Sequence, residues 1–335
     1  MRIKSIQRFL CANDIDAALI FNEANILSLT GIKCDNACLL VKSRDFLFFT
    51  DFRYIPEVRR LRSDIKVRDI KRLYSNFPKA SKIGFEPSIS YGRFMQMKKA
   101  FPKAEFIDIS DVISDLRSVK TSDEIDRIRR AEALNVEIFN SAISLFSPGM
   151  TEKEMALIIK RMMIERAEGE AFETIVCVGA NAAECHHRPD DTVWNGREGV
   201  LIDLGLKLDG VCSDLTRNIL PKRPSKLYKK VYDVVLEANR SAIKAAKPGI
   251  SAKALDKIAR DVITKAGFGK CFGHSLGHGV GYEIHESPTL SKRFNTILKP
   301  GMIVTIEPGI YLEGNLGVRI EDLILITEEG CEVLS

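Results

Sequence analysis

The sequence predicts an α/β domain over residues 1–118, followed by a larger domain of mixed helices and strands over residues 119–335. A length of 335 residues is typical of two domains. Charge divides the chain near the same place, since residues 1–120 carry a net charge of +8 and the remainder carry −3. All five histidines lie in the second part, at positions 186, 187, 274, 278 and 285.

Strand-like and helical segments alternate in the first domain, which favours an α/β fold with a mixed or parallel sheet. Amphipathic patterns predict helices over Ile3–Ala12, over Arg53–Leu61 and near Arg93–Ala100. Short apolar runs predict five strands, at Ala17–Phe21, Cys38–Val41, Phe46–Thr50, Lys82–Phe85 and Glu105–Ile109.

Capping signals mark the helices of the second domain. Thr121 and Thr151 each precede a glutamate by three residues, so both are expected to cap helices, which end near Ser147 and Gly169. Two further helices are predicted, over Leu227–Ala246 and Ser251–Ala266. The predicted strands of this domain are Thr174–Val178, Val200–Leu204, Val211–Leu220, Met302–Glu307 and Arg319–Ile326.

Two aspartates lie in a predicted β-hairpin of the second domain. Asp209-Gly210 is a two-residue turn signal, and a turn there places Asp203 opposite Thr216. Asp203 and Asp214 then become diagonal neighbours on one face of the sheet, about 7–8 Å apart. Two carboxylates in apolar strands repel each other and lose hydration, and a cation between them removes both problems. The alternative is a pair of solvent-facing carboxylates.

A glycine-rich segment over residues 272–286 contains three histidines, His274, His278 and His285, and four glycines. Imidazole can serve as a metal ligand or as a proton shuttle near neutral pH. Glycines allow the backbone to approach a ligand closely. A phosphate-binding loop is the alternative, but the segment lacks the GxxxxGK[ST] pattern of such loops.

Two glutamates complete a candidate metal site. Glu307 lies in the segment Ile-Glu-Pro-Gly and Glu321 in Arg-Ile-Glu-Asp, each within or at the end of an apolar run. Either one alone is typical of a surface carboxylate. Together with two aspartates and one histidine they predict a site for two divalent metal ions, Mn²⁺ or Co²⁺ first, with Zn²⁺ and Fe²⁺ as alternatives. Two such ions about 3.5–4 Å apart can activate a water and polarise a carbonyl.

The order of these motifs resembles the pita-bread metallopeptidases, which include methionine aminopeptidases, aminopeptidase P and prolidase. The shared order is an aspartate, a second aspartate eleven positions on, Gly-His-Gly, Ile-Glu-Pro-Gly and Arg-Ile-Glu-Asp, over residues 118–335. Residues 1–118 resemble the creatinase-type N-terminal domain of the branch that acts on Xaa-Pro peptides. The resemblance implies an α/β creatinase-like domain followed by an α+β pita-bread catalytic domain.

The resemblance also implies roles for individual residues. Asp203 would bind one metal ion, whereas Asp214 and Glu321 would bridge both. His278 and Glu307 would bind the second metal ion, and Glu307 would also relay a proton. Arg319 would lie near the metals as a substrate-binding cation, with an ion pair to a ligand carboxylate or another acid as its alternative role. Thr216 and Asp322 are expected to support the ligands.

Three further histidines are expected to handle substrate in this resemblance. His274 and His285 would line the substrate pocket, with His285 near the scissile carbonyl. His186 lies 17 positions before Asp203, as does the histidine of the family's Pro-His-x-x-Pro segment, so His186 is assigned as catalytic and substrate-binding. His187 is then a bystander.

Two positions depart from the family pattern. Cys185 replaces the proline of Pro-His-x-x-Pro, in the loop that carries His186. Thr289 stands where some archaeal dipeptidases have an arginine suited to a free substrate carboxylate. The absence of that arginine argues against a strict dipeptidase. The implied substrates are therefore Xaa-Pro peptides or dipeptides, and the implied assembly is a homodimer.

Composition restricts the compartment and the partners. The N-terminus lacks the apolar segment of a signal peptide, and no apolar stretch is long enough to span a membrane. The eight cysteines include no CxxC pair, so we expect reduced, mostly buried thiols and a cytoplasmic protein. A basic cluster at residues 59–72 lacks interleaved stacking aromatics, which argues against nucleic-acid binding. The remaining alternative is a non-peptidase pita-bread protein, either a creatinase-like enzyme or a binding module.

Overall fold

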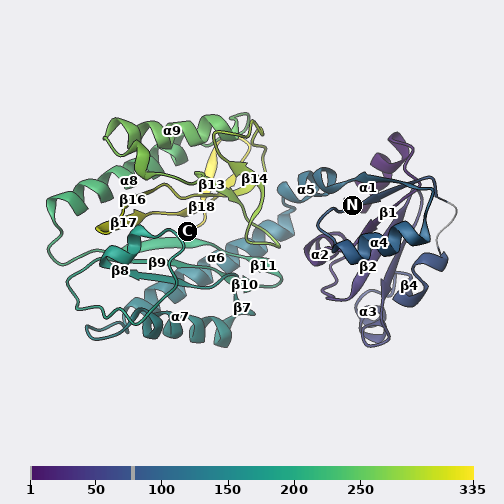
Figure 1. Cartoon of the computed structure of the whole chain (residues 1–335), viewed down its shortest axis with the longest axis horizontal. Helices are drawn as coiled ribbons and strands as arrows, with labels where there is room; N and C mark the ends of the chain where they lie inside the picture. Colours follow the sequence, from purple (N-terminus) through teal and green to yellow (C-terminus); the bar gives the residue numbers. More distant parts are fainter. Residues whose placement is uncertain (1, 77–79) are drawn as a thin grey trace. The chain divides into compact units, whose positions relative to one another are not determined.

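The chain is described by a computed structural model that covers residues 2–76 and 80–335 (Figure 1). It divides into two compact units, the first ending at Arg117 and the second beginning at Ser118. Among the described residues, none of the helices combines the length and the hydrophobicity that crossing a bilayer requires. All eight cysteines are free thiols, and four of them are buried rather than the expected majority.

The first unit is built on a six-stranded sheet in the spatial order β4-β3-β2-β1-β5-β6. Its strands are β1 (Ala17–Ile20), β2 (Ala37–Lys42), β3 (Phe46–Thr50), β4 (Val67–Asp69), β5 (Lys82–Phe85) and β6 (Glu105–Asp108). Strand β2 pairs antiparallel with β1 and β3, whereas the β1–β5, β5–β6 and β3–β4 pairs are parallel. The sheet is therefore mixed, one of the two forms that the sequence predicts.

Helices cover both faces of this sheet. They are α1 (Arg2–Ala12), α2 (Glu23–Thr30), α3 (Ile55–Leu61), α4 (Tyr91–Ala100) and α5 (Ser110–Ser118). Alternate residues of β2 serve opposite faces, since Leu39 joins the core that contains Ile6 of α1, and Leu40 joins the core that contains Met97 of α4. The sequence did not predict α2 and α5.

Four long helices frame the second unit: α6 (Ser122–Ile143), α7 (Glu152–Arg166), α8 (Lys226–Ala245) and α9 (Ala252–Lys265). Thr121 and Thr151 form the predicted capping boxes of α6 and α7, each with its N–H and side chain bonded reciprocally to a glutamate. Within this unit, α8 and α9 lie on one side of the strands and α6 and α7 on the other (Figure 1).

The strands of the second unit form four sheets, ordered β11-β10-β7, β12-β9-β8, β14-β13-β15-β18-β19 and β16-β17. They are β7 (Gly169–Glu170), β8 (Ile175–Val178), β9 (Val200–Leu204), β10 (Leu206–Leu208), β11 (Val211–Cys212), β12 (Leu215–Ile219), β13 (Gly277–Gly279), β14 (Glu286–Leu290), β15 (Ile303–Ile306), β16 (Gly309–Leu312), β17 (Leu316–Arg319), β18 (Asp322–Ile326) and β19 (Cys331–Val333).

Two predicted strands are interrupted, so the expectation of continuous strands there was wrong. The predicted strand 211–220 breaks at Ser213 and Asp214, between β11 and β12. The predicted strand 319–326 breaks at Ile320 and Glu321, between β17 and β18. In both places the chain passes from one sheet to another, which a single-sequence pattern does not reveal. Each break falls on a predicted metal-binding carboxylate.

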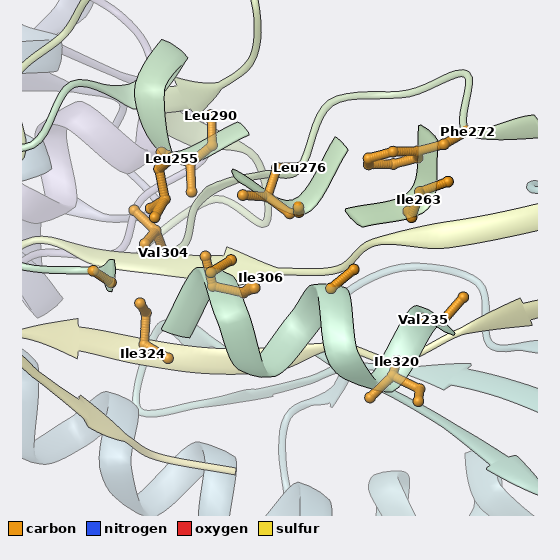
Figure 2. Packing of buried hydrophobic residues seen from close by; sticks show 14 of the residues in the cluster. Val235, Leu255, Ile263, Phe272, Leu276, Leu290, Val304, Ile306, Ile320 and Ile324 are labelled. Atoms are coloured by element: carbon orange, nitrogen blue, oxygen red, sulfur yellow. The ribbon is translucent and has the colours of Figure 1, made fainter. Parts of the chain in front are cut away.

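A hydrophobic core joins α8 and α9 to the five-stranded sheet (Figure 2). Leu255 of α9 packs in this core with Val304 and Ile306 of β15 and Ile324 of β18. Each of these side chains is fully buried, which is worth about 1.5–3 kcal/mol per side chain. The packing fixes β15 and β18, and therefore the positions of Glu307 and Glu321 at their ends.

Candidate metal centre

The hairpin that carries the two aspartates has the predicted register. Asp209 and Gly210 both have positive φ, 50° and 75°, which gives the turn the twist of a two-residue hairpin. Asp203 of β9 lies opposite Thr216 of β12, as predicted. The N–H of Ser213 donates to the carbonyl of Leu206 at 2.9 Å, so the register persists through the interruption.

Glu321 joins the same row of residues through an isolated bridge to Thr216. The N–H of Glu321 donates to the carbonyl of Thr216 at 3.2 Å. The hydroxyl of Thr216 donates to Oε2 of Glu321 at 2.7 Å. Thr216 therefore lies between Asp203 of β9 and Glu321 at the break between β17 and β18, and it aligns two carboxylates that are 118 positions apart in the sequence.

His278 is held at the centre of β13 by two glycines. A Cβ atom on Gly277 would lie 2.0 Å from the carbonyl oxygen of Thr305, and one on Gly279 would lie 2.3 Å from that of Ser287. Only glycine fits this close backbone approach. The ring Nδ1 of His278 lies 3.1 Å from the carbonyl of Gly279, so Nδ1 carries the proton and Nε2 presents its lone pair to the site.

The predicted ligands gather around this Nε2 atom. Ligand atoms of Asp214, His278 and Glu321 all lie within 4.8 Å of one another. Nε2 of His278 is 3.5 Å from Oδ2 of Asp214 and 3.4 Å from Oε1 of Glu307. Asp203 is close enough to act electrostatically on Asp214, Glu307 and Glu321. Its Oδ1 atom is buried and has no hydrogen-bond partner.

The electrostatics of this cluster favour a bound cation. Burial, followed by the charges of Glu321 and Asp203, raises the pKa of Asp214 well above its ordinary range. Burial, followed by Glu307 and Asp203, does the same to the pKa of Glu321. Burial raises the pKa of Glu307 to about 8. Burial, followed by His285, lowers the pKa of His278 to about 4, so the imidazole is neutral.

These residues fit divalent metal ions. A buried carboxylate oxygen without a donor, three carboxylates that resist ionisation and a neutral imidazole nitrogen are all stabilised by a cation among them. One nitrogen and otherwise oxygen ligands suit hard or borderline divalent ions.

Arg319 is buried against the same cluster. Its Nη2 donates to Oδ2 of Asp203 at 2.5 Å and its Nε donates to Oγ1 of Thr216 at 3.1 Å. Its Nη1 donates to the hydroxyl of Tyr311 at 3.0 Å. The Tyr311 hydroxyl lies 2.8 Å from Nε2 of His274, to which it can donate. A hydrogen-bonded chain thus runs from His274 to Asp203. The geometry matches the ion pair that the sequence left as the alternative role of Arg319.

Tyr311 is a residue that the sequence did not identify. It lies in the short strand β16, four positions after Glu307, without a motif of its own. Its hydroxyl contacts both Arg319 and His274, which come from strand β17 and from the segment before β13. Only the fold brings these three side chains together.

The remaining histidines occupy three different environments. The ring of His285 packs edge-on against that of His278, with centroids 4.3 Å apart. His186 is exposed and acts electrostatically on both His274 and His285. His187 is buried, and its Nε2 lies 2.7 Å from Oε2 of Glu152. This ion pair joins His187 to the first residue of α7, outside the candidate metal cluster.

Comparison with known proteins identifies the family of this chain. Residues 126–328 match metallopeptidase family M24, and residues 2–119 match the Creatinase/Prolidase N-terminal domain. The chain belongs to metallopeptidase family M24. The resemblance to pita-bread metallopeptidases, with a creatinase-type domain before the catalytic domain, is confirmed.

Full-length relatives of this M24 chain come from archaea and bacteria. An Xaa-Pro dipeptidase of Pyrococcus horikoshii is 37% identical over 100% of this chain and 96% of its own length. The prolidase structure from Pyrococcus horikoshii, 37% identical, covers 99% of this chain and 97% of its own, with a TM-score of 0.95. An X-Pro aminopeptidase structure from Thermotoga maritima, 37% identical, covers 96% of this chain and 95% of its own, with a TM-score of 0.88.

Proposed function

We propose that this M24 metallopeptidase is a dinuclear exopeptidase that cleaves the bond between an N-terminal residue and proline. The observation that carries the proposal is the convergence of Asp203, Asp214, His278, Glu307 and Glu321 on one buried cluster. The substrate class is supported by full-length relatives named as an Xaa-Pro dipeptidase and an X-Pro aminopeptidase. The non-peptidase alternative is not favoured, because these full-length relatives are named as peptidases.

The five clustered residues would hold two divalent metal ions, and we propose Mn²⁺ or Co²⁺. When bound, such ions supply Lewis-acid polarisation of the scissile carbonyl and lower the pKa of a water molecule. Asp203 would serve one ion, Asp214 and Glu321 both, and His278 and Glu307 the second. Hydrogen bonds from neighbouring side chains orient two of these ligands, since Thr216 donates to Glu321 and Arg319 donates to Asp203.

The protein's own groups would position the peptide and move the proton. Glu307 is the proposed proton carrier toward the proline nitrogen, which becomes an amine as the bond breaks. His285, packed against His278, would donate a hydrogen bond to the carbonyl oxygen as negative charge develops there. His186 and His274 would contact the substrate, and His186 is near enough to His274 and His285 to act on both electrostatically.

The proposed substrate length rests on Thr289. This residue lies directly opposite His278 in the β13–β14 pair. Its neutral hydroxyl offers no positive charge for the free carboxylate of a dipeptide. We therefore propose that the enzyme accepts Xaa-Pro-Yaa peptides as well as Xaa-Pro dipeptides. The homodimer and the cytoplasmic location stay predictions.

Hydrolysis assays test both parts of this proposal. With added Mn²⁺ or Co²⁺, we expect cleavage of Met-Pro and Leu-Pro, release of the first residue from an Xaa-Pro-Yaa tripeptide, and little cleavage of Leu-Ala. Cleavage of dipeptides alone would establish a strict dipeptidase. Equal cleavage of Leu-Ala would refute the Xaa-Pro assignment.

A variant of the bridging aspartate tests the metal centre. Asp214→Asn is expected to lower metal occupancy and to abolish Xaa-Pro cleavage. The matched control is Asp209→Asn, the same substitution at the exposed turn of the same hairpin, where positive φ tolerates asparagine. The control should keep full metal content and activity. Full activity in Asp214→Asn would refute the role of Asp214.

A further inference from the structure

The core-facing side of helix α6 carries two polar residues that the metal centre does not use directly. Glu132 and Asn135 are both fully buried, on the same face as the apolar Ile128, Ala131 and Ile138. Polar groups at such positions are costly unless hydrogen bonds compensate them. Their hydrogen bonds go to the backbone beside two of the proposed metal ligands.

Glu132 holds the backbone at Asp214. Its Oε2 accepts the N–H of Asp214 at 3.1 Å. Asp214 lies at the break between β11 and β12, where its N–H has no strand partner, and the glutamate takes that place. Without Glu132 this buried N–H would lose its acceptor.

The other oxygen of Glu132 reaches the strand that follows Glu321. Oε1 accepts the hydroxyl of Ser335 at 2.7 Å, and that hydroxyl oxygen accepts the N–H of Leu323 at 2.8 Å. Leu323 lies in β18, two residues after Glu321. One carboxylate therefore connects the segments that carry both of the proposed bridging ligands.

Asn135 makes the corresponding contact to the first aspartate, one helical turn along α6. Its Nδ2 donates to the carbonyl of Leu204 at 2.9 Å. Leu204 directly follows Asp203 in β9. Glu132 and Asn135, three positions apart on one face of α6, thus hold the backbone N–H of Asp214 and the carbonyl of the residue after Asp203.

We propose that Glu132 and Asn135 are positioning residues that fix the separation of Asp203, Asp214 and Glu321 for metal binding. The proposal rests on the metal centre proposed above. Neither residue has to touch a metal ion or the substrate. A rigid helix with two buried hydrogen-bonding groups sets the backbone from which the ligand side chains extend.

Variants of Glu132 separate positioning from mere stability. Glu132→Gln keeps an acceptor of the same size for the N–H of Asp214, so its Mn²⁺ affinity should stay within about threefold of wild type. Glu132→Leu fills the same volume but removes the acceptor, and should weaken Mn²⁺ binding by about 10–100-fold. The control, Ile138→Ala, removes apolar volume from the same buried face without affecting a hydrogen bond.

The experiment is calorimetric titration of the full-length, metal-free chain with Mn²⁺ alone, with thermal unfolding recorded for every variant. We expect weakened binding in Glu132→Leu, and a lower melting temperature with unchanged Mn²⁺ affinity in Ile138→Ala. Wild-type affinity in a folded Glu132→Leu variant would overturn the proposal. If that variant does not fold, Asn135→Ala decides: weaker Mn²⁺ binding than Ile138→Ala supports the proposal, and equal binding overturns it. Absence of Mn²⁺ binding in the wild type would refute the metal centre itself.

Discussion

The hydroxyl of Thr216 donates a hydrogen bond to Glu321 at 2.7 Å, and the same oxygen accepts one from Arg319 at 3.1 Å. Thr216 also lies opposite Asp203 in the β9–β12 pair. The small buried side chain of Thr216 therefore aligns two proposed metal ligands, Asp203 and Glu321, together with the guanidinium of Arg319. The sequence marks Thr216 only as a candidate supporting residue, and the structure gives it three specific partners.

Removal of this hydroxyl should weaken the metal centre. Thr216→Val keeps the shape of the side chain but leaves Oε2 of Glu321 and Nε of Arg319 without a partner. We expect a loss of about 1–3 kcal/mol in the free energy of unfolding and metal binding that is about 10–100-fold weaker. Chemical denaturation and metal titration measure the two effects. Thr216→Ser keeps the hydroxyl and should retain the stability and the metal affinity of the wild type. A loss of either would show that the methyl group of Thr216 matters more than its hydroxyl.

Arg319→Lys distinguishes the two roles considered for this cation. Lysine keeps the charge but cannot contact Asp203, Thr216 and Tyr311 at once, because it lacks the planar fork of guanidinium. If Arg319 orients Asp203, metal affinity should fall about 10–100-fold while KM changes little once metal is saturating. A raised KM with unchanged metal affinity would instead establish Arg319 as a substrate-binding residue.

Alanine substitutions should distinguish the proposed roles of His278 and His285. His285→Ala removes a proposed donor to the carbonyl oxygen, so kcat should fall about 10²–10³-fold while metal content persists. His278→Ala removes a proposed ligand, so metal content itself should fall. Metal analysis beside steady-state kinetics provides the comparison. Loss of metal in His285→Ala, with retention in His278→Ala, would reverse the two assignments.

The His187–Glu152 pair predicts a pH-dependent contribution to stability. Burial disfavours the charged imidazolium, but the carboxylates of Glu152 and Glu184 outweigh burial and raise the pKa of His187 above its ordinary value of 6.5. A raised pKa in the folded state means stabilisation that is fully present below pH 6.5 and is lost as the pH rises through the folded value.

Urea unfolding between pH 6 and pH 9 measures this contribution. We expect His187→Gln to be less stable than wild type by about 1–3 kcal/mol at the acidic end, and the difference to shrink as the pH rises. Glu152→Gln should lower the pKa of His187, which NMR titration of the ring protons can follow. A stability difference that grows with pH would contradict this assignment.

Local patterns predict much of the fold because the signals are local. The capping boxes at Thr121 and Thr151 and the turn at Asp209-Gly210 depend on residues within a few positions, and all three occur as predicted. The hairpin register follows from that turn, so the sequence also predicts the pairing of Asp203 with Thr216. The short helices α2 and α5 escape prediction because tertiary packing contributes more to short helices than their own periodicity does.

The sequence by itself determined the family, the two-domain order and the residue types of the proposed metal centre, since these are carried by motifs of a few residues each. Only the tertiary structure decided how Thr216 aligns Asp203 with Glu321, how Tyr311 joins His274 to Arg319, and how Glu132 reaches Asp214. These contacts join residues that are far apart in the chain. They arise where strands break and change sheets, and such breaks depend on the packing of whole layers rather than on any local pattern.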